Sequence, residues 1–304
     1  MHIPSRVIVR EVSARDGLQS EKTLVSTAHK IELLNRIASA GFQRINAVSF
    51  VSPEAVPQMA DSEAVMAGIT RAPGVLYDAS TANVKGARRA VAAGVDALSV
   101  FIAATETSNR KNVRRSIAES MAAVPAVVEV AAAAGIPVTG TIIGAFGCPY
   151  EGEVSDVQIL SMASQYVEAG CSGFLLGDTT GVANPVQVER IVGKMLDAYP
   201  DRELYLHFHN TRGAGLANVV AAINAGATMF DASLAGIGGC PFIAGASGNI
   251  VTEDLVHMLH DMGIETGIDI DAVLDAAKFV STLIPRPTAS HLLVAGKRTK
   301  LLPA

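Results

Sequence analysis

One stretch of the sequence, residues 173–234, reads GFLLGDTTGVANPVQVERIVGKMLDAYPDRELYLHFHNTRGAGLANVVAAINAGATMFDASL. Its short runs at 173–177, 204–208 and 229–234 have the length and composition of buried strands. The two longer segments between them carry apolar residues at helical spacing. Strands that alternate with helices are typical of a parallel sheet, because each helix carries the chain back to the edge where the next strand begins.

The same alternation extends outward over the rest of the chain. Strands are predicted at 7–13, 44–50, 75–79, 97–103, 137–145, 173–177, 204–208 and 229–234. Helices are predicted at 26–40, 62–70, 83–93, 113–134, 155–169, 185–198, 215–225 and 252–262. Pro125 should kink or split the longest helix, because proline cannot donate a backbone hydrogen bond there. Eight strand-then-helix units favour an α/β fold closed as a (β/α)8 TIM barrel over an open doubly wound sheet.

Nothing in the chain looks like a linker, so residues 1–304 are predicted to form a single TIM-barrel domain. Barrels of this kind routinely exceed 200 residues as one domain. Residues 265–304 are predicted to be a C-terminal extension, with an additional C-terminal helix near 270–283. We expect this extension to cap the barrel or to help form a subunit contact.

Composition narrows the functional classes. Hydrophobic residues make up 49% of the chain and charged residues only 17%, which is typical of a globular protein with a large core. The net charge of −5 argues against general binding of nucleic acid. No apolar run is long enough and free enough of charge to predict a membrane span. Three cysteines cannot build a dense disulfide framework, and the N-terminus lacks the apolar core of a signal peptide, so a reducing, cytoplasmic location is predicted.

Polar residues gather at the predicted C-terminal ends of three strands, where the catalytic groups of such barrels lie. Arg15 and Asp16 follow the first strand, and His207 and His209 end the seventh. A glycine-rich loop follows the eighth strand and leads to Asn249. Because strand eight closes against strand one, we expect these groups to meet at one sector of the barrel mouth.

These residues predict a site for a divalent metal ion. His207 and His209 are two positions apart on a strand and therefore point the same way. With the Asp16 carboxylate and the Asn249 amide oxygen they offer mixed nitrogen and oxygen ligands, which suit Mg2+ or Mn2+ and also Zn2+ or Fe2+. Two histidines and a carboxylate also occur in non-haem iron oxygenases, so that class stays open. Each of these sequence features alone is more often structural than metal-binding. Their expected position at the same rim of the barrel favours a metal site.

Seven segments carry a resemblance to a known family. They are EVSARDGLQSEK, SFVSPEAVPQMAD, GCPYEGEV, LGDTTGVANP, HFHNT, SLAGIGGCPF and GASGNIVTEDLV, between about Val7 and Asp271. In order and spacing they resemble the motifs of the 3-hydroxy-3-methylglutaryl-CoA lyases. That family belongs to a wider group of metal-dependent barrel lyases and Claisen-type synthases, which share the HxH pair. The synthases usually carry further C-terminal domains, and this chain has some twenty residues after its last predicted helix.

The resemblance implies a role for each matching residue. Asp16, His207, His209 and Asn249 would bind Mg2+ or Mn2+. Four residues, Arg15, Cys240, His207 and Asp178, would form the catalytic set. Arg15 would stabilise negative charge on the thioester oxygen, and Cys240, on a mobile glycine-rich loop, would transfer a proton at the acetyl carbanion. Lys22 would contact the CoA portion of an acyl-CoA substrate, and the protein would be a homodimer.

The implied activity is carbon–carbon cleavage of a 3-hydroxyacyl-CoA, with 3-hydroxy-3-methylglutaryl-CoA giving acetyl-CoA and acetoacetate. The chemistry needs the hydroxyl proton removed and the departing carbanion stabilised as an enolate. A metal ion bound to the hydroxyl lowers its pKa. A fixed guanidinium opposite the developing oxyanion stabilises the transition state more than the ground state.

One substrate-binding position departs from the family. Asn46 stands where the family has a glutamate that pairs with the catalytic arginine, and Asn210 follows HxH where an aspartate is usual. An amide can accept a hydrogen bond from Arg15 but supplies no negative charge, so we expect a more positive site. Three interpretations remain open: a lyase for citramalyl-CoA or a longer-chain hydroxyglutaryl-CoA, a slow methylglutaryl-CoA lyase, or a catalytically impaired ligand-binding homologue.

Overall fold

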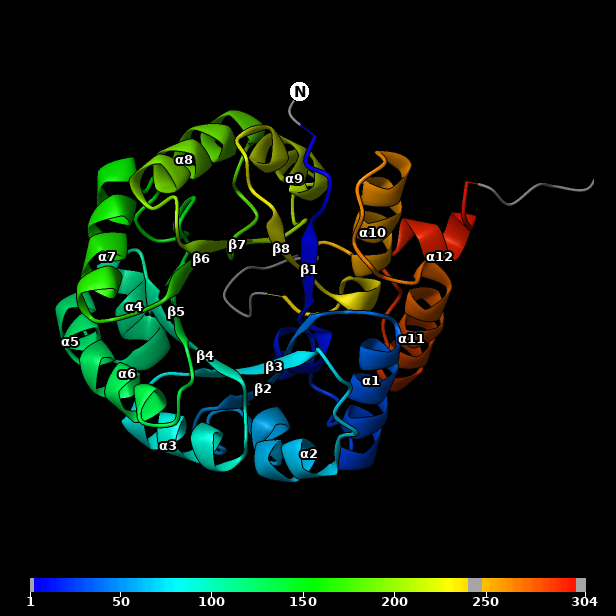
Figure 1. The fold of residues 1–304 in the computed structure, drawn as a ribbon, viewed down its shortest axis with the longest axis horizontal. Coiled ribbons are helices and arrows are strands. Elements are labelled where there is room, and N and C mark those ends of the chain that lie inside the picture. Colours follow the sequence, from blue (N-terminus) through cyan, green and yellow to red (C-terminus); the bar gives the residue numbers. More distant parts are fainter. Residues whose placement is uncertain (1–2, 240–247, 299–304) are drawn as a thin grey trace, which may run out of the picture.

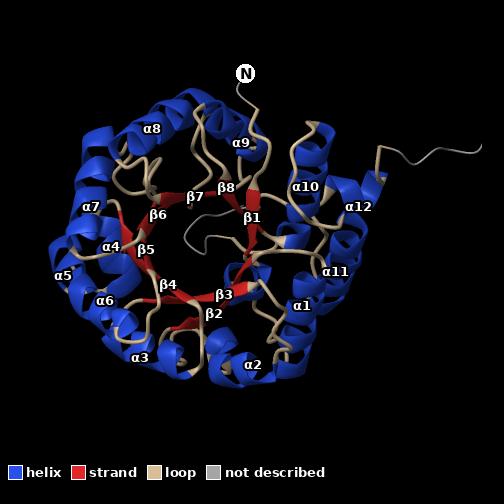
Figure 2. Cartoon of the chain, in the orientation of Figure 1, coloured by secondary structure: helices blue, strands red, loops and turns tan. Residues whose placement is uncertain are grey.

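A computed structural model describes residues 3–239 and 248–298. Its eight strands are all parallel and close into a barrel in chain order, as predicted (Figure 1). The strands are β1 (Ile8–Glu11), β2 (Arg44–Phe50), β3 (Leu76–Thr81), β4 (Ala97–Ala103), β5 (Val138–Ile143), β6 (Gly173–Asp178), β7 (Glu203–Phe208) and β8 (Met229–Ala232). Helices surround the barrel, so the strands are buried on their outer faces (Figure 2).

The helices follow the predicted pattern except between residues 106 and 134 and after residue 290. They are α1 (Thr27–Ser39), α2 (Ser62–Gly68), α3 (Val84–Ala92), α4 (Glu106–Val113), α5 (Ile117–Ala122), α6 (Val124–Ala132), α7 (Asp156–Glu168), α8 (Pro185–Ala198), α9 (Gly215–Asn224), α10 (Thr252–Asp261), α11 (Ile270–Leu283) and α12 (His291–Ala295). The helix predicted at 113–134 is split into α5 and α6 at Pro125, as predicted, but its predicted start is wrong because residue 113 belongs to α4. Helix α4 ends at Arg114, which takes a left-handed conformation, and Pro125 stands in the first turn of α6, where its missing N–H is not needed.

The C-terminal helix predicted near 270–283 is confirmed as α11, which packs against α1 and α10. The shorter α12 follows it and was not predicted. That residues 1–304 form a single domain, with 265–304 as its C-terminal extension, stays a prediction. Within residues 3–239 and 248–298, no helix is both long and apolar enough to cross a membrane.

Closure of the barrel makes β7, β8 and β1 neighbours, as predicted. Strand β1 pairs with β8 from Ile8 opposite Met229, and His207 of β7 lies opposite Asp231 of β8. Since alternate residues of a strand face the same way, Arg10, His207 and Asp231 all project into the barrel. Residues that are about 200 positions apart in sequence thereby lie close together inside the barrel.

The junction between β1 and β8 is held by a buried carboxyl group. Glu11 accepts hydrogen bonds from the backbone N–H of Ser13 at 2.8 Å, from that of Leu234 at 3.2 Å and from the hydroxyl of Thr252 at 2.5 Å. Burial raises the pKa of Glu11 to about 7, although these donors oppose the rise. Glu11 therefore ties the turn after β1, which carries Asp16, to the chain after β8.

This buried group predicts a pH dependence of stability. A pKa of about 7 in the folded state, against 4.5 when unfolded, means that the folded protein binds the extra proton between these pH values. The free energy of unfolding should therefore fall as pH rises from about 4.5 to 7, by about 3 kcal/mol from this group alone. Urea unfolding at pH 5 and pH 8 measures this effect. Between these pH values the free energy of unfolding should fall more for the wild type than for Glu11→Gln. A constant difference between the two proteins would contradict the prediction.

Candidate functional site

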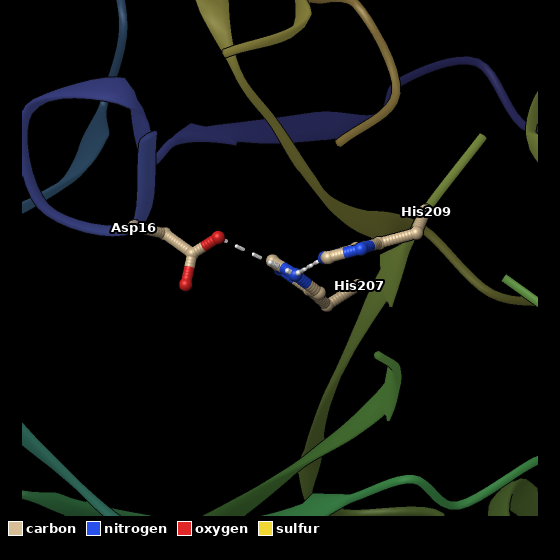
Figure 3. Close-up of side chains that lie close together, drawn as sticks. All are labelled: Asp16, His207 and His209. Carbon is tan, nitrogen blue, oxygen red and sulfur yellow. Dashed lines mark hydrogen bonds and ion pairs between the residues drawn. The ribbon is translucent and has the colours of Figure 1, made fainter. Parts of the chain in front are cut away.

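Asp16, His207 and His209 lie together at the mouth of the barrel (Figure 3). One ligand atom from each lies within 4.8 Å of the others. The Nε2 atoms of the two histidines are 3.1 Å apart, and His207 Nε2 is 3.8 Å from Asp16 Oδ2. The sequence prediction that these three side chains converge is thus met by the geometry.

A tight turn after β1 places Asp16. Residues Ser13–Gly17 form one turn of π-helix, in which the backbone N–H groups of Arg15, Asp16 and Gly17 all donate to the carbonyl of Val12. A Cβ atom at Gly17 would lie 2.6 Å from the side chain of Ile237, so only glycine fits where this turn packs against the chain after β8. The turn aims Asp16 across the mouth toward β7.

The protonation of Asp16 and of His209 suits a cation, whereas for His207 the effect of burial is outweighed by Asp231 and Asp16, which raise its pKa. Burial alone would raise the pKa of Asp16, but the nearby His207, Arg15 and His209 outweigh it and bring the pKa to about 2. Burial, assisted by His207, lowers the pKa of His209 to about 4. A carboxylate and a neutral imidazole at physiological pH are the forms that bind divalent metals. His209 is 4% exposed and its Nδ1 has no hydrogen-bond partner among the described residues. The residues therefore fit a metal ion.

A second carboxylate orients His207. Asp231 Oδ2 lies 3.0 Å from His207 Nδ1, so this nitrogen carries the proton when Asp231 is ionised. His207 Nε2 then faces Asp16 and His209 with its lone pair. Asp231 is 2% exposed and is held in turn by Arg10, which donates to both of its carboxylate oxygens at 2.8 Å.

Arg15 and Asn249 complete the predicted cluster. Arg15 Nη1 donates to Asp16 Oδ1 at 2.9 Å, and its buried Nε has no partner among the described residues. The guanidinium thus lies at the cavity wall with donor capacity left for another group. Asn249 donates its Nδ2 to Asp16 Oδ2 at 2.9 Å and to the carbonyl of Ile237 at 3.0 Å. Asn249 therefore supports Asp16, and its role as an oxygen ligand stays a prediction.

Of the three further predicted residues, Asp178 and Lys22 do not line the cavity beside this cluster, and Cys240 lies outside the described residues. Asp178 is 1% exposed and accepts hydrogen bonds from the backbone of Val182 and Ala183, and burial raises its pKa to about 7. Lys22 is exposed on the connection from β1 to α1. The roles assigned to these three residues stay predictions.

Asn46 lies on the cavity wall, and its role in substrate binding stays a prediction, but its hydrogen-bond partner is different from the one expected. It accepts no hydrogen bond from Arg15. Instead, its Nδ2 donates to Asp78 Oδ1 at 2.5 Å, and Asp78 Oδ1 also lies 3.5 Å from Arg10 Nη1. The expectation of a more positive site counted only Asn46 and Asn210, and it missed this buried aspartate and arginine. Charged residues inside two predicted barrel strands were the signal that could have revealed them.

The cavity beside the metal site has a volume of about 250 Å³. It begins at Asp16, His207 and His209 and extends across the barrel to β3, β4 and β5, whose inward side chains form the opposite wall. Lys111 and Tyr150 stand at the outer rim of that wall, with the ammonium 5.0 Å from the centre of the ring. The arrangement offers a metal site, a free arginine donor and an interior pocket for a small group.

Comparison with known proteins gives one consistent result. A family model described as HMGL-like matches residues 6–280. The chain is 43% identical to the mitochondrial hydroxymethylglutaryl-CoA lyase of Gallus gallus over 97% of this chain and 99% of that protein. It is 44% identical to the cytoplasmic 3-hydroxy-3-methylglutaryl-CoA lyase of Danio rerio, over 95% and 87%. An HMG-CoA lyase structure from Acinetobacter baumannii, in complex with coenzyme A and 3-methylmalate, has a TM-score of 0.95 and 46% identity over 99% of this chain and 98% of that one.

Proposed function

Because this chain belongs to the HMGL-like family of hydroxymethylglutaryl-CoA lyases, we propose that it cleaves 3-hydroxy-3-methylglutaryl-CoA to acetyl-CoA and acetoacetate. The observation that carries the proposal is the convergence of Asp16, His207 and His209 beside Arg15 at one mouth of the barrel. The chain is accordingly a carbon–carbon lyase. A condensing synthase or an iron oxygenase finds no comparable support.

A carboxylate with two imidazoles is compatible with several divalent ions, and we choose Mg2+ or Mn2+ because the resemblance to the family implies them. Asp16, His207 and His209 would hold the ion, with Asp231 keeping the His207 ring in orientation. A bound ion supplies Lewis acidity that lowers the pKa of the substrate hydroxyl and fixes its orientation.

Arg15 provides the electrostatic part of catalysis. Its position at the cavity wall lets the guanidinium face the thioester oxygen as negative charge develops there. Its ion pair with Asp16 holds the side chain in place before the substrate arrives, so little reorganisation is needed during the reaction. This is the arrangement in which a fixed cation favours the transition state over the ground state.

The proton balance requires an acid at the departing carbon. The hydroxyl gives its proton to a base, its oxygen becomes the ketone carbonyl of acetoacetate as the carbon–carbon bond breaks, and the acetyl carbanion gains a proton from an acid. We assign this last transfer to the thiol of Cys240 because a thiol of suitable pKa can act as a general acid. The assignment of Cys240 rests on the family motif. We also propose that the enzyme is a cytoplasmic homodimer; the relative from Danio rerio is a cytoplasmic lyase.

Metal removal and restoration test the proposed function. After dialysis against EDTA, we expect acetyl-CoA release from 3-hydroxy-3-methylglutaryl-CoA to fall to the background rate. Addition of Mg2+ or Mn2+ should restore it, because no other described cluster of His, Cys, Asp and Glu could hold the ion. Acetyl-CoA can be followed by coupled absorbance, and acetoacetate by a second enzyme. Equal release with and without metal, or none in either case, would overturn the proposal.

A further inference from the structure

One buried arginine inside the barrel is linked to a candidate metal ligand through a single carboxylate. Arg10 of β1 is 5% exposed, and the strand register places it directly opposite Asp231 of β8. Asp231 is in turn directly opposite His207 of β7. The three strands are consecutive neighbours in the closed barrel (Figure 1). Asp231 therefore lies between the arginine and the histidine and contacts both side chains.

Both oxygens of Asp231 take part in this link. Arg10 donates from Nε to Oδ1 and from Nη2 to Oδ2, each at 2.8 Å. Oδ2 also lies 3.0 Å from Nδ1 of His207. Two parallel hydrogen bonds from one guanidinium fix the plane of a carboxylate as well as its position. Arg10 therefore determines the direction from which Asp231 meets the imidazole ring.

The guanidinium of Arg10 is itself held from its other sides. Its central carbon lies 4.6 Å from the centre of the Tyr205 ring, and its Nη1 lies 3.5 Å from Oδ1 of Asp78. Asp78 also accepts a hydrogen bond from the amide of Asn46. Each of the three nitrogens of Arg10 thus has a carboxylate partner. These partners commit the guanidinium to the protein, although the residue lines the cavity.

The orientation of the His207 ring decides whether it can bind a cation. A histidine ligand must present the lone pair of one ring nitrogen, and an acceptor at the other nitrogen fixes both the tautomer and the ring direction. Asp231 is that acceptor, and it leaves Nε2 of His207 facing Asp16 and His209. A buried carboxylate such as Asp231 needs a charged partner to remain in place. Arg10 supplies this partner.

We propose that Arg10 is a positioning residue for the metal ion, which acts through Asp231 to hold the His207 ring in the orientation that a divalent cation requires. The inference rests on the proposed function in taking Asp16, His207 and His209 as the ligands. Because its nitrogens are already paired with carboxylates, Arg10 should affect the affinity for the metal rather than the affinity for the thioester.

The affinity for Mn2+, measured by electron paramagnetic resonance of the free ion without substrate, tests the inference. Arg10→Lys keeps the positive charge beside the two aspartates but loses the parallel pair of bonds to Asp231. We expect the Kd for Mn2+ to rise by about tenfold, the lower end of the loss seen when a partner of a metal ligand is removed. An unchanged Kd would refute the inference.

Arg44→Lys is the matched control for this variant. Arg44 is the direct neighbour of Arg10 on β2, and it pairs with Glu203 rather than with Asp231. The control therefore replaces an arginine of an adjacent strand that also makes an ion pair, but leaves the link to His207 intact. Its Kd for Mn2+ should equal that of the wild type. An equal rise in both variants would mean that any lost ion pair in the barrel weakens the site, which contradicts a specific role for Arg10.

A double-mutant cycle separates action through Asp231 from a general effect on the fold. Asp231→Asn removes the charge that Arg10 holds but keeps an oxygen that can accept from His207. In this background Arg10→Lys should raise the Kd for Mn2+ by less than about twofold, since coupled residues are not additive. The full rise in both backgrounds would show that Arg10 acts by another route, and the inference would be wrong.

Kinetics at saturating Mn2+ distinguish a positioning residue from one that binds the substrate. The KM of Arg10→Lys for 3-hydroxy-3-methylglutaryl-CoA should stay within about twofold of the wild-type value, and added Mn2+ should recover most of kcat. A raised KM with wild-type Mn2+ affinity would instead assign Arg10 to the substrate and exclude the positioning role.

Mn2+ affinity and acetyl-CoA release together separate this inference from the lyase proposal. If Arg10→Lys binds Mn2+ more weakly than the wild type but neither protein releases acetyl-CoA, the positioning role stands and the lyase proposal fails. If the wild type cleaves 3-hydroxy-3-methylglutaryl-CoA and Arg10→Lys binds Mn2+ equally well, the lyase proposal stands and the positioning role fails. A wild type that binds no Mn2+ would contradict both.

Discussion

Replacing His209 with alanine is expected to lower the affinity for Mn2+ by more than about 100-fold, since even residues that only support a metal ligand contribute 10- to 100-fold. The ring of His209 has a pKa of about 4, so a neutral nitrogen is available to the ion at pH 7. His209 is also the ligand whose loss disturbs the protein least. Its Nδ1 has no described partner, whereas removal of His207 would leave Asp231 without one of its hydrogen bonds.

Electron paramagnetic resonance of free Mn2+ measures this affinity without any assay of activity. Lyase activity should fall to background at metal concentrations that saturate the wild type. His29→Ala is a matched control, because His29 is exposed on α1 and remote from the metal site. Retention of wild-type Mn2+ affinity by His209→Ala would show that the ion, if any, is bound elsewhere.

Replacing Arg15 with methionine should lower kcat by about 100- to 1,000-fold while KM changes less than tenfold. Loss of one preorganised donor to a developing oxyanion has an effect of this size. Methionine preserves much of the volume of the side chain but removes the charge opposite the thioester oxygen. Arg15→Lys should be intermediate, because lysine keeps the charge without the planar array of donors.

Mn2+ binding distinguishes this effect from damage to the metal site. Arg15 pairs with Asp16, but the pKa of Asp16 is about 2, far enough below neutrality that the carboxylate should stay ionised in the variant. Mn2+ affinity should therefore remain near the wild-type value. A large fall in affinity would assign Arg15 to support of the ligand, and an unchanged kcat would remove it from the proposed chemistry.

Much of the fold could be read from local patterns. Apolar runs with strand length and helices with 3.6-residue spacing recur eight times, and such periodicity depends only on neighbouring residues. The split between α5 and α6 at Pro125 was predicted, but the break between α4 and α5 was not. The break between α4 and α5 depends on the left-handed conformation of Arg114, which no side-chain pattern predicts.

The convergence of the three candidate metal ligands was also predictable, because one topological rule suffices for it. Once strand eight closes on strand one, Asp16 must lie near His207 and His209 at the same rim. The partner of Asn46 was not predictable in this way. It depends on the register of β2 against β3, which places Asn46 opposite Asp78 and shifts at a bulge directly after that pair.

The sequence alone determined the barrel, its order of strands and the rim where Asp16 and the two histidines meet, because these follow from periodicity and from the closure of eight parallel strands. Only the tertiary structure decided how the interior charges pair and which hydroxyls line the cavity. Arg10 pairs with both Asp78 and Asp231 across three strands, while Ser80, Ser99 and Thr141 line the cavity. Such pairing depends on distances of a few ångströms between side chains from different strands, and local sequence does not specify them.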